Sequence, residues 1–134
     1  MVVDARIAGR VRSAGVGDRL PREVVDRQVA RRLAAAAVVV PGTAGIDAYA
    51  AELDRAADRF AAWDGRVLVL PPDGNDAHRL LVVDRYRQVF HVAEAPSVDG
   101  LPSVDELEEW FKLLATMCPE CGVLDDPLGR GWTP

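Results

Sequence analysis

The feature that most constrains this chain is an unbroken apolar run, Leu33–Val40, that stops abruptly at Pro41-Gly42. A strand with one solvent-facing side alternates apolar and polar residues, whereas a strand buried on both faces is apolar throughout. The alanines in the run would also suit a helix, but the closing valines and the Pro-Gly stop favour a strand. A strand of this kind needs a layer packed on each side, which predicts an α/β fold.

A helix and a second buried strand are expected next along the chain. Apolar residues recur at spacings of three and four between positions 46 and 63, which gives a helix one continuous apolar face. Gly65 is placed to end that helix in a left-handed cap. The run Arg66–Leu70 is again apolar and β-branched, and Pro71 stops it, so we expect a strand parallel to the first.

The following segment predicts a hairpin and a last helix. Residues 79–83 and 88–92 are two β-rich runs around a short polar loop, as in an antiparallel hairpin. Ser103 followed by Glu106 is a capping-box pattern, which predicts a helix over 103–118. We expect three large rings on the two predicted helices to be largely buried: Trp63, Trp110 and Phe111.

The ends of the chain carry weaker patterns. Residues 23–30 fit either a short edge hairpin or part of a helix ending at Arg32, and we favour the hairpin. Residues 1–15 fit a flexible or basic arm, and residues 122–134, rich in proline and glycine, predict an irregular tail. With 134 residues, the chain is expected to form a single domain, 1–134, around one core.

The charge pattern argues against nucleic-acid binding. The net charge is −5, although the first 32 residues hold eight arginines against four acids. Such an arm either binds polyanions or is a solvated surface that offsets an acidic body, and we favour the solvated surface. All the aromatic residues lie beyond it, so no base-stacking platform accompanies the arginines.

Apolar-run length and cysteine content indicate a cytoplasmic protein. The longest apolar run, Leu33–Pro41, is too short to span a bilayer, and the N-terminus lacks the pattern of a signal peptide, so we expect no membrane partner. Two cysteines, Cys118 and Cys121, do not make a secreted disulfide framework. A reducing compartment is therefore the expected location.

The order strand, helix, strand, hairpin, helix is that of a thioredoxin fold, and three stretches resemble the peroxiredoxin-like redoxin family of alkyl hydroperoxide reductases and thiol-specific antioxidants. Val16–Pro21 resembles the family's Gly-Asp-x-x-Pro motif, and 38–70 resembles its central strand-helix-strand. Leu81–Phe90 resembles its hairpin, with Arg87 where glycine is usual. The resemblance covers about residues 16–117. It implies a thioredoxin-like three-layer sandwich, with helices on both faces of a mixed central sheet.

The chain departs from that family at the residues of the peroxidase reaction. Family enzymes carry Pro-x-x-x-Thr/Ser-x-x-Cys where the strand enters the helix, so that the helix N-terminus stabilises a thiolate. Counting from Pro41 places Gly45 at the hydroxyl position and Ala48 at the cysteine position. Neither side chain can do that chemistry, so no peroxidase residues carry over.

The Cys118-Pro-Glu-Cys121-Gly motif is the one chemically loaded pattern, and four interpretations stay open. A redox dithiol fits the spacing, although a helix C-terminus raises a thiol pKa and no basic residue flanks the pair. A zinc or iron knuckle would need ligands from another chain or from His78 and His91. A structural disulfide and two quiet thiols are the remaining interpretations.

No other pattern indicates a cofactor or metal site. The loop after Val40 lacks the lysine and the glycine count of a phosphate-binding loop, and the loop acids lack calcium-binding spacing. His91 follows Phe90 in a predicted strand, so we expect the two to face opposite sides, with His91 at the surface. We assign no cofactor and no metal ligand.

Two functions from different classes follow. The chain is a thiol-disulfide oxidoreductase that uses Cys118 and Cys121 as catalytic residues, with a thiol or disulfide protein as its partner. Alternatively it is a non-catalytic thioredoxin-fold interaction module, a homodimer with a metal knuckle being one form of it.

Overall fold

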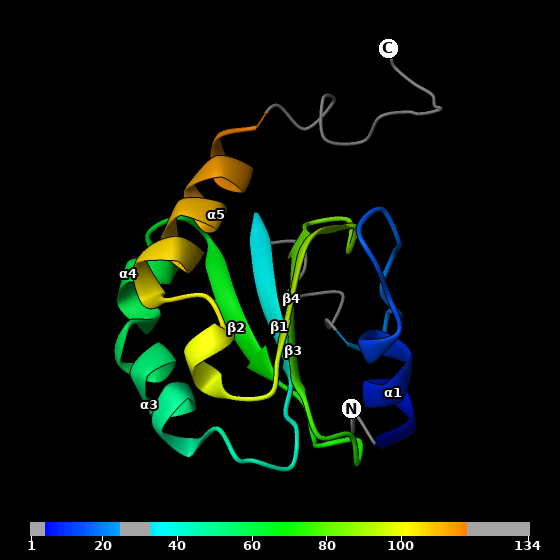
Figure 1. Cartoon of the computed structure of the whole chain (residues 1–134). Coiled ribbons are helices and arrows are strands. Elements are labelled where there is room, and N and C mark those ends of the chain that lie inside the picture. Colours follow the sequence, from blue (N-terminus) through cyan, green and yellow to red (C-terminus); the bar gives the residue numbers. More distant parts are fainter. Residues whose placement is uncertain (1–4, 25–32, 118–134) are drawn as a thin grey trace.

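The computed structural model describes residues 5–24 and 33–117, which surround one four-stranded sheet (Figure 1). Its strands, in chain order, are β1 (Ala35–Val40), β2 (Gly65–Val69), β3 (His78–Asp84) and β4 (Val89–Ala95). In space they lie in the order β2-β1-β3-β4, with β1 and β2 parallel and the other two pairs antiparallel. The mixed sheet, the buried strand β1 and the hairpin are confirmed. The second strand, β2, is present and parallel to β1, but it lies at the end of the sheet with Arg66 and Val69 exposed, so the expectation that it is buried is wrong.

Strand β1 lies inside the sheet, between β2 and β3, because its residues are apolar throughout and need cover on both faces. All six of its residues are buried. Ala35, Ala37 and Val39 face one hydrophobic cluster, and the alternate residues face another on the opposite side of the sheet. The apolar run therefore has the two covered faces that it requires.

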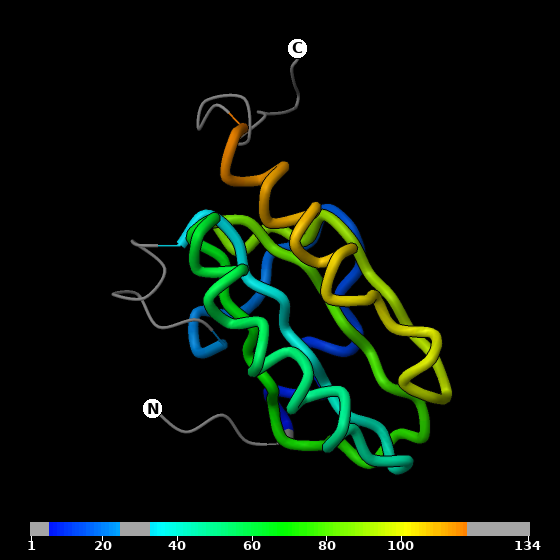
Figure 2. The backbone as a smooth tube through the Cα atoms, turned by 90° about the vertical axis from the view of Figure 1, so that its left-hand side faces the viewer, coloured from blue at the N-terminus to red at the C-terminus, as the bar shows by residue number. Residues whose placement is uncertain are grey.

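Three helices cover the first face: α3 (Asp47–Arg55), α4 (Ala57–Ala61) and α5 (Val104–Thr116). Figure 2 looks onto this layer, with α5 lying alongside the α3 and α4 pair in front of the strands. The predicted helix over 46–63 is present but interrupted at Ala56, which separates α3 from α4. Its buried side chains are those that the spacing predicted: Ile46, Tyr49, Leu53 and Phe60.

Helix α5 begins as its sequence predicts. The Ser103 hydroxyl oxygen accepts a hydrogen bond from the Glu106 backbone N–H at 3.2 Å, which caps the helix. Leu107, Phe111 and Leu114 form its buried face. The helix ends at Thr116, two residues earlier than predicted. A short 3₁₀ turn, η1 (Val98–Gly100), lies between β4 and α5.

The second face is covered by α1 (Ala5–Arg12) and the irregular segment that follows it (Figure 1). Ile7, Ala8 and Val11 of α1 and Leu20 of the segment are buried against the sheet. The prediction of a flexible or basic arm is therefore wrong over residues 5–15, because this stretch has an apolar face that packs on the sheet. Helices on both faces make the three-layer α/β arrangement that was expected.

Two details of packing differ from the sequence-based expectations. The left-handed residue that ends α4 is Asp64, with φ 53°, and not Gly65, which begins β2. Gly65 is required for another reason, since a Cβ there would lie 2.6 Å from the Phe111 ring. Of the three rings expected to be buried, Phe111 is, whereas Trp63 and Trp110 are only partly buried at the border of the core.

A β-bulge overturns the expected facing of Phe90 and His91. Val82 pairs with His91 but Val83 pairs with Val89, so Phe90 is the extra residue in β4. Both rings consequently lie on the α5 side, where Phe90 packs against the core and His91 stacks on Trp110.

Some predictions fall on undescribed residues. The N-terminal hairpin over 23–30 lies mostly outside the described ranges, and so does the tail over 122–134. None of the helices in the part that the structure describes is long and apolar enough to cross a membrane.

Candidate functional site

The β1–α3 junction, residues 41–48, is the place where a redoxin would carry its chemistry. It follows the end of β1 and leads into α3, beside the loop that connects β2 to β3. Pro41 and Gly42 are buried, and a Cβ on Gly42 would lie only 2.2 Å from the Asp76 carbonyl oxygen. Two backbones therefore pass in contact at this end of the sheet, and only glycine fits at position 42.

His78 at the start of β3 binds the backbone of the junction. Its ring is fully buried at the start of β3, and its Nδ1 accepts a hydrogen bond of 2.8 Å from the Gly42 N–H. An accepting Nδ1 leaves the proton on Nε2 in the neutral ring, and that Nε2 has no hydrogen-bond partner. Burial, and then the positive charge of Arg12, lower the pKa of His78.

An ion pair ties α1 to the same end of the sheet. The Arg12 Nε donates to an Asp73 carboxylate oxygen at 2.5 Å, and both side chains are largely buried. Asp73 also accepts from the Asn75 side chain at 2.9 Å. Burial alone would raise the pKa of Asp73, but the bonds from Arg12 and Asn75 outweigh it and hold the pKa below its usual value.

The surface of the junction has no nucleophile suited to redoxin chemistry. Gly45 and Ala48, which occupy the family's hydroxyl and cysteine positions, are both exposed. The exposed hydroxyl nearby, on Thr43, donates to the Asp76 carboxylate at 3.2 Å. Ile46 precedes α3 without any side-chain capping bond. The polar groups of the junction thus hold its own loops together.

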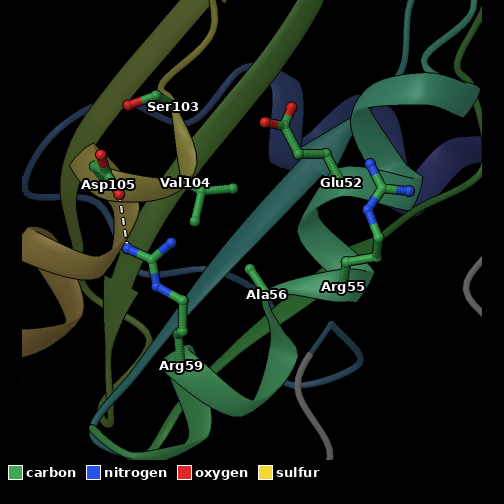
Figure 3. A pocket seen from close by; sticks show the side chains of 7 residues that line it. All are labelled: Glu52, Arg55, Ala56, Arg59, Ser103, Val104 and Asp105. Atoms are coloured by element: carbon green, nitrogen blue, oxygen red, sulfur yellow. Dashed lines mark hydrogen bonds and ion pairs between the residues drawn. The ribbon is translucent and has the colours of Figure 1, made fainter.

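A second concave region lies between α3/α4 and α5 (Figure 3). This open groove has a volume of about 430 Å³ and is lined by Glu52, Arg55, Ala56, Arg59, Ser103, Val104 and Asp105. The Arg59 guanidinium points across it and donates to Asp105 at 2.7 Å, and also to Glu108. The one hydroxyl among the residues that line the groove, that of Ser103, already caps α5. The two acids and two arginines that line it balance, which leaves no net charge to attract an ionic substrate.

Tyr49 explains why these two helical segments keep their relative position. Its buried hydroxyl donates to the Pro102 carbonyl at 2.7 Å, which links α3 to the start of α5. Burial raises the pKa of Tyr49, and the carboxylates of Glu52 and Glu106 add to the effect. A phenol held in this state is a structural donor rather than an acid or base at neutral pH.

The structure does not bring the two histidines together as metal ligands. His78 bonds to the Gly42 backbone, whereas His91 stacks on Trp110 with ring centroids 4.9 Å apart. Their positions on the hairpin differ by four residues in register, about 13 Å along a strand. Within residues 5–24 and 33–117, no group of three or more ligating side chains could hold a metal ion.

The predicted catalytic pair, Cys118 and Cys121, lies outside the described residues. The described part of the chain contains no cysteine, so all thiol chemistry depends on that pair. The Arg12–Asp73 ion pair could not be predicted from the sequence, because the partners are 61 positions apart and neither belongs to a motif. The one usable signal was Arg12 on the apolar side of a helix that was not recognised.

No protein-family model matches the chain, and comparisons with curated proteins and with solved structures found no match either.

Proposed function

We propose that this chain is a thioredoxin-like interaction module whose β1–α3 junction carries out no peroxidase chemistry. The observation that carries the proposal is the pair of exposed residues at the junction, Gly45 just before α3 and Ala48 in its first turn, where a redoxin needs a hydroxyl and a thiolate. The nearby polar groups are used in holding the loops, so they add no substitute nucleophile.

The arrangement of elements supports the thioredoxin-like part of the proposal. A parallel β1–α3/α4–β2 unit followed by an antiparallel hairpin and a final helix is the thioredoxin order, and the strands lie in the matching order β2-β1-β3-β4. Arg87 adds a local argument. It stands where the redoxin hairpin carries glycine, and its φ of 67° is one that glycine adopts without strain. The Arg87 Nε donates to the Leu20 carbonyl at 3.0 Å, which helps to hold this conformation.

Thiol-disulfide exchange by Cys118 and Cys121 is the second candidate. What favours it is that both cysteines of the chain fall in this one motif and none in the described core, so the pair is free of a structural role there. In that reaction the two thiols would reduce a disulfide of the partner protein to two thiols, becoming a disulfide themselves. A dithiol donor would then return them to the reduced state.

Activity measurements separate the two candidates. The purified chain is assayed with a small alkyl hydroperoxide and, separately, with a small disulfide, using dithiothreitol as the electron donor. The variant with both Cys118→Ser and Cys121→Ser is the control. We expect hydroperoxide and disulfide turnover no faster than dithiothreitol alone, for the chain and for its variant.

Each other outcome has a definite meaning. Disulfide turnover that the double variant loses would favour the oxidoreductase over the interaction module. Hydroperoxide turnover that survives in the double variant would overturn the proposal, because it would need a reactive centre that is not a thiol.

A further inference from the structure

The loop that leaves β1 is held to the start of β3 by two side-chain bonds. Residues 41–45 follow the end of β1 and belong to no strand. The Gly42 N–H donates to His78 Nδ1 at 2.8 Å, and the Thr43 hydroxyl donates to the Asp76 carboxylate at 3.2 Å. The first bond is buried and the second is exposed, so the bond to His78 is the one that water does not replace in the closed loop.

The His78 ring can accept that bond in one protonation state only. In the neutral ring the proton lies on Nε2, and Nδ1 is free to accept from Gly42. A proton taken from solvent onto Nδ1 makes both ring nitrogens donors, and two N–H groups would then face each other across 2.8 Å. The ring is fully buried, and its Nε2 has no hydrogen-bond partner in the described part of the chain. The closed loop therefore offers the protonated ring no acceptor.

The charges near the ring also disfavour a cation there. Burial, and then the positive charge of Arg12, lower the pKa of His78. The Asp73 carboxylate is already bonded to Arg12. The residue opposite His78 on β4 is Ala95, which is uncharged, and the ring shares its face of β3 with a leucine and a valine. Protonation would thus add a second cation beside an ion pair that is already complete.

The two ends of the loop are anchored independently of its bond to His78. Before it, all six residues of β1 pair with β3. After it, Ile46 is buried in the core, and the Tyr49 hydroxyl donates to the Pro102 carbonyl at 2.7 Å. The backbone of His78 is itself fixed by its pairing with β4. The part that can yield is therefore the loop 41–45, and neither β1 nor α3 needs to unfold.

The loop itself buries little. Residues 43–45 are exposed, and only Pro41 and Gly42 are buried. The close approach of Gly42 to the segment before β3 is made by backbone, with no side chain that opening would remove from the core. A segment with few buried apolar contacts opens locally at a lower free-energy cost than the sheet.

We propose that His78 and Gly42 form a pH switch, in which protonation of the ring releases the loop 41–45 from the start of β3 while the sheet and α3 stay folded. In the open state the ring contacts water, where its ordinary pKa of 6.5 applies. The closed loop is therefore favoured at neutral pH and loses population as the pH falls below 6.5. This switch goes beyond the proposed function and does not depend on it.

Native-state hydrogen exchange of the full chain, measured residue by residue, tests the switch. The protection factor compares each amide with an unstructured chain at the same pH. For the Gly42 amide it should fall by up to about tenfold per pH unit below 6.5, because opening takes up one proton. Low concentrations of denaturant should leave it unchanged, since a local opening exposes little surface, whereas the protection of the β1 amides should fall.

Variants separate the ring from the other contacts of the loop. His78→Asn presents an oxygen that accepts from Gly42 and does not titrate, so the pH dependence of Gly42 protection should disappear. Thr43→Val removes the other bond of the loop and should lower Gly42 protection at every pH without changing the slope. His91→Asn is the matched control and should change neither the protection nor the slope. The pH and denaturant series on the unmodified chain do not require His78→Asn to fold.

Three results would each overturn the switch. Gly42 protection that falls with denaturant as steeply as that of the β1 amides would mean that the loop opens only when the whole chain unfolds. A Gly42 protection factor that stays constant below pH 6.5 would show that protonation of His78 does not release the loop. A pH dependence that survives in His78→Asn would assign the acid sensitivity to another group.

Discussion

The two faces of the sheet are buried by different means. The α3–α5 face is covered by regular helices whose large side chains interlock, as where Phe60 and Phe111 meet edge to face with centroids 5.0 Å apart. Among the described residues, the α1 face is covered by one helix of eight residues and by an irregular segment in which Leu20 and Val24 are buried. Regular helices fix their side chains on a rigid frame, whereas an irregular segment can shift to refill a gap. We therefore expect the same truncation to cost more on the α3–α5 face.

The largest effect is expected at Phe111. Its ring is fully buried and contacts Phe60 and the β2 backbone at Gly65, so Phe111→Ala should lower the free energy of unfolding by about 3–5 kcal/mol. Denaturant titration measures this directly. Trp110→Ala is the control on the same helix, and it should cost less because Trp110 is only partly buried. Equal losses at the two positions would remove Phe111 from the centre of this core.

A matched pair of leucines tests the comparison itself. Leu53 on α3 and Leu20 in the irregular segment are each 2 % exposed, so Leu→Ala removes the same buried atoms at both. Each change should cost about 2–5 kcal/mol, with Leu53 in the upper part of that range and Leu20 in the lower part. The reason is that a cavity costs less where its walls can collapse. Should Leu20→Ala prove the more damaging, the α1 face would be as rigid as the other.

The same difference explains how much of the fold could be predicted from the sequence. The α3–α5 face was predictable because its helices repeat apolar residues every three or four positions and its last helix carries the Ser103 cap. The apolar side of α1 was missed because Ile7, Ala8 and Val11 are few and lie among arginines and glycines. The arginines in this stretch therefore suggested a basic arm, although a short helix needs only one apolar stripe to pack on a sheet.

Part of the candidate site could likewise be predicted from the sequence, and part could not. Counting from Pro41 was enough to place the family's hydroxyl and cysteine positions at Gly45 and Ala48, both exposed in the structure, because a motif spacing is local information. The contacts that build the junction are long-range, such as Gly42 with His78 and Arg12 with Asp73. Nothing in the spacing of these residues predicts that they meet. The facing of His91 was wrong for a related reason, because a single extra residue in β4 reverses the alternation.

A smaller effect is expected where β2 meets α5. Adding a methyl group by Gly65→Ala would place a Cβ 2.6 Å from the Phe111 ring, and overpacking of this kind costs about 1–3 kcal/mol. In a Phe111→Leu background the same change should cost clearly less, because the smaller side chain vacates the space. A double-mutant cycle measures this coupling. Strictly additive losses would mean that the close contact is relieved elsewhere.

The smallest effect is the dependence of the free energy of unfolding on pH, and it arises at His78, which lies at one end of the sheet near Arg12 of α1. His78 lies on the α3–α5 side of β3, with Leu80 and Val82, and the charged group that acts on it is Arg12 of α1, which is itself paired with Asp73 of the β2–β3 loop. Burial, followed by the Arg12 charge, lowers the pKa of His78 from its ordinary value of 6.5. Protonation would also place a proton on Nδ1, which now accepts from the Gly42 N–H.

The sign of the pH dependence follows from that lowered pKa. Well above pH 6.5 the ring is neutral in both the folded and the unfolded chain, so this group contributes no pH dependence there. Below 6.5 the unfolded chain takes up the proton first, and the free energy of unfolding falls as the pH drops toward the folded-state pKa. The slope from one group is at most about 1.4 kcal/mol per pH unit. His78→Asn offers an oxygen to Gly42 in place of Nδ1 and should flatten this slope, even if its overall stability is lower. His91→Asn, which also removes a histidine, is the matched control. A slope that His78→Asn leaves intact would show that other groups cause the acid sensitivity, and that the junction does not depend on a neutral ring at position 78.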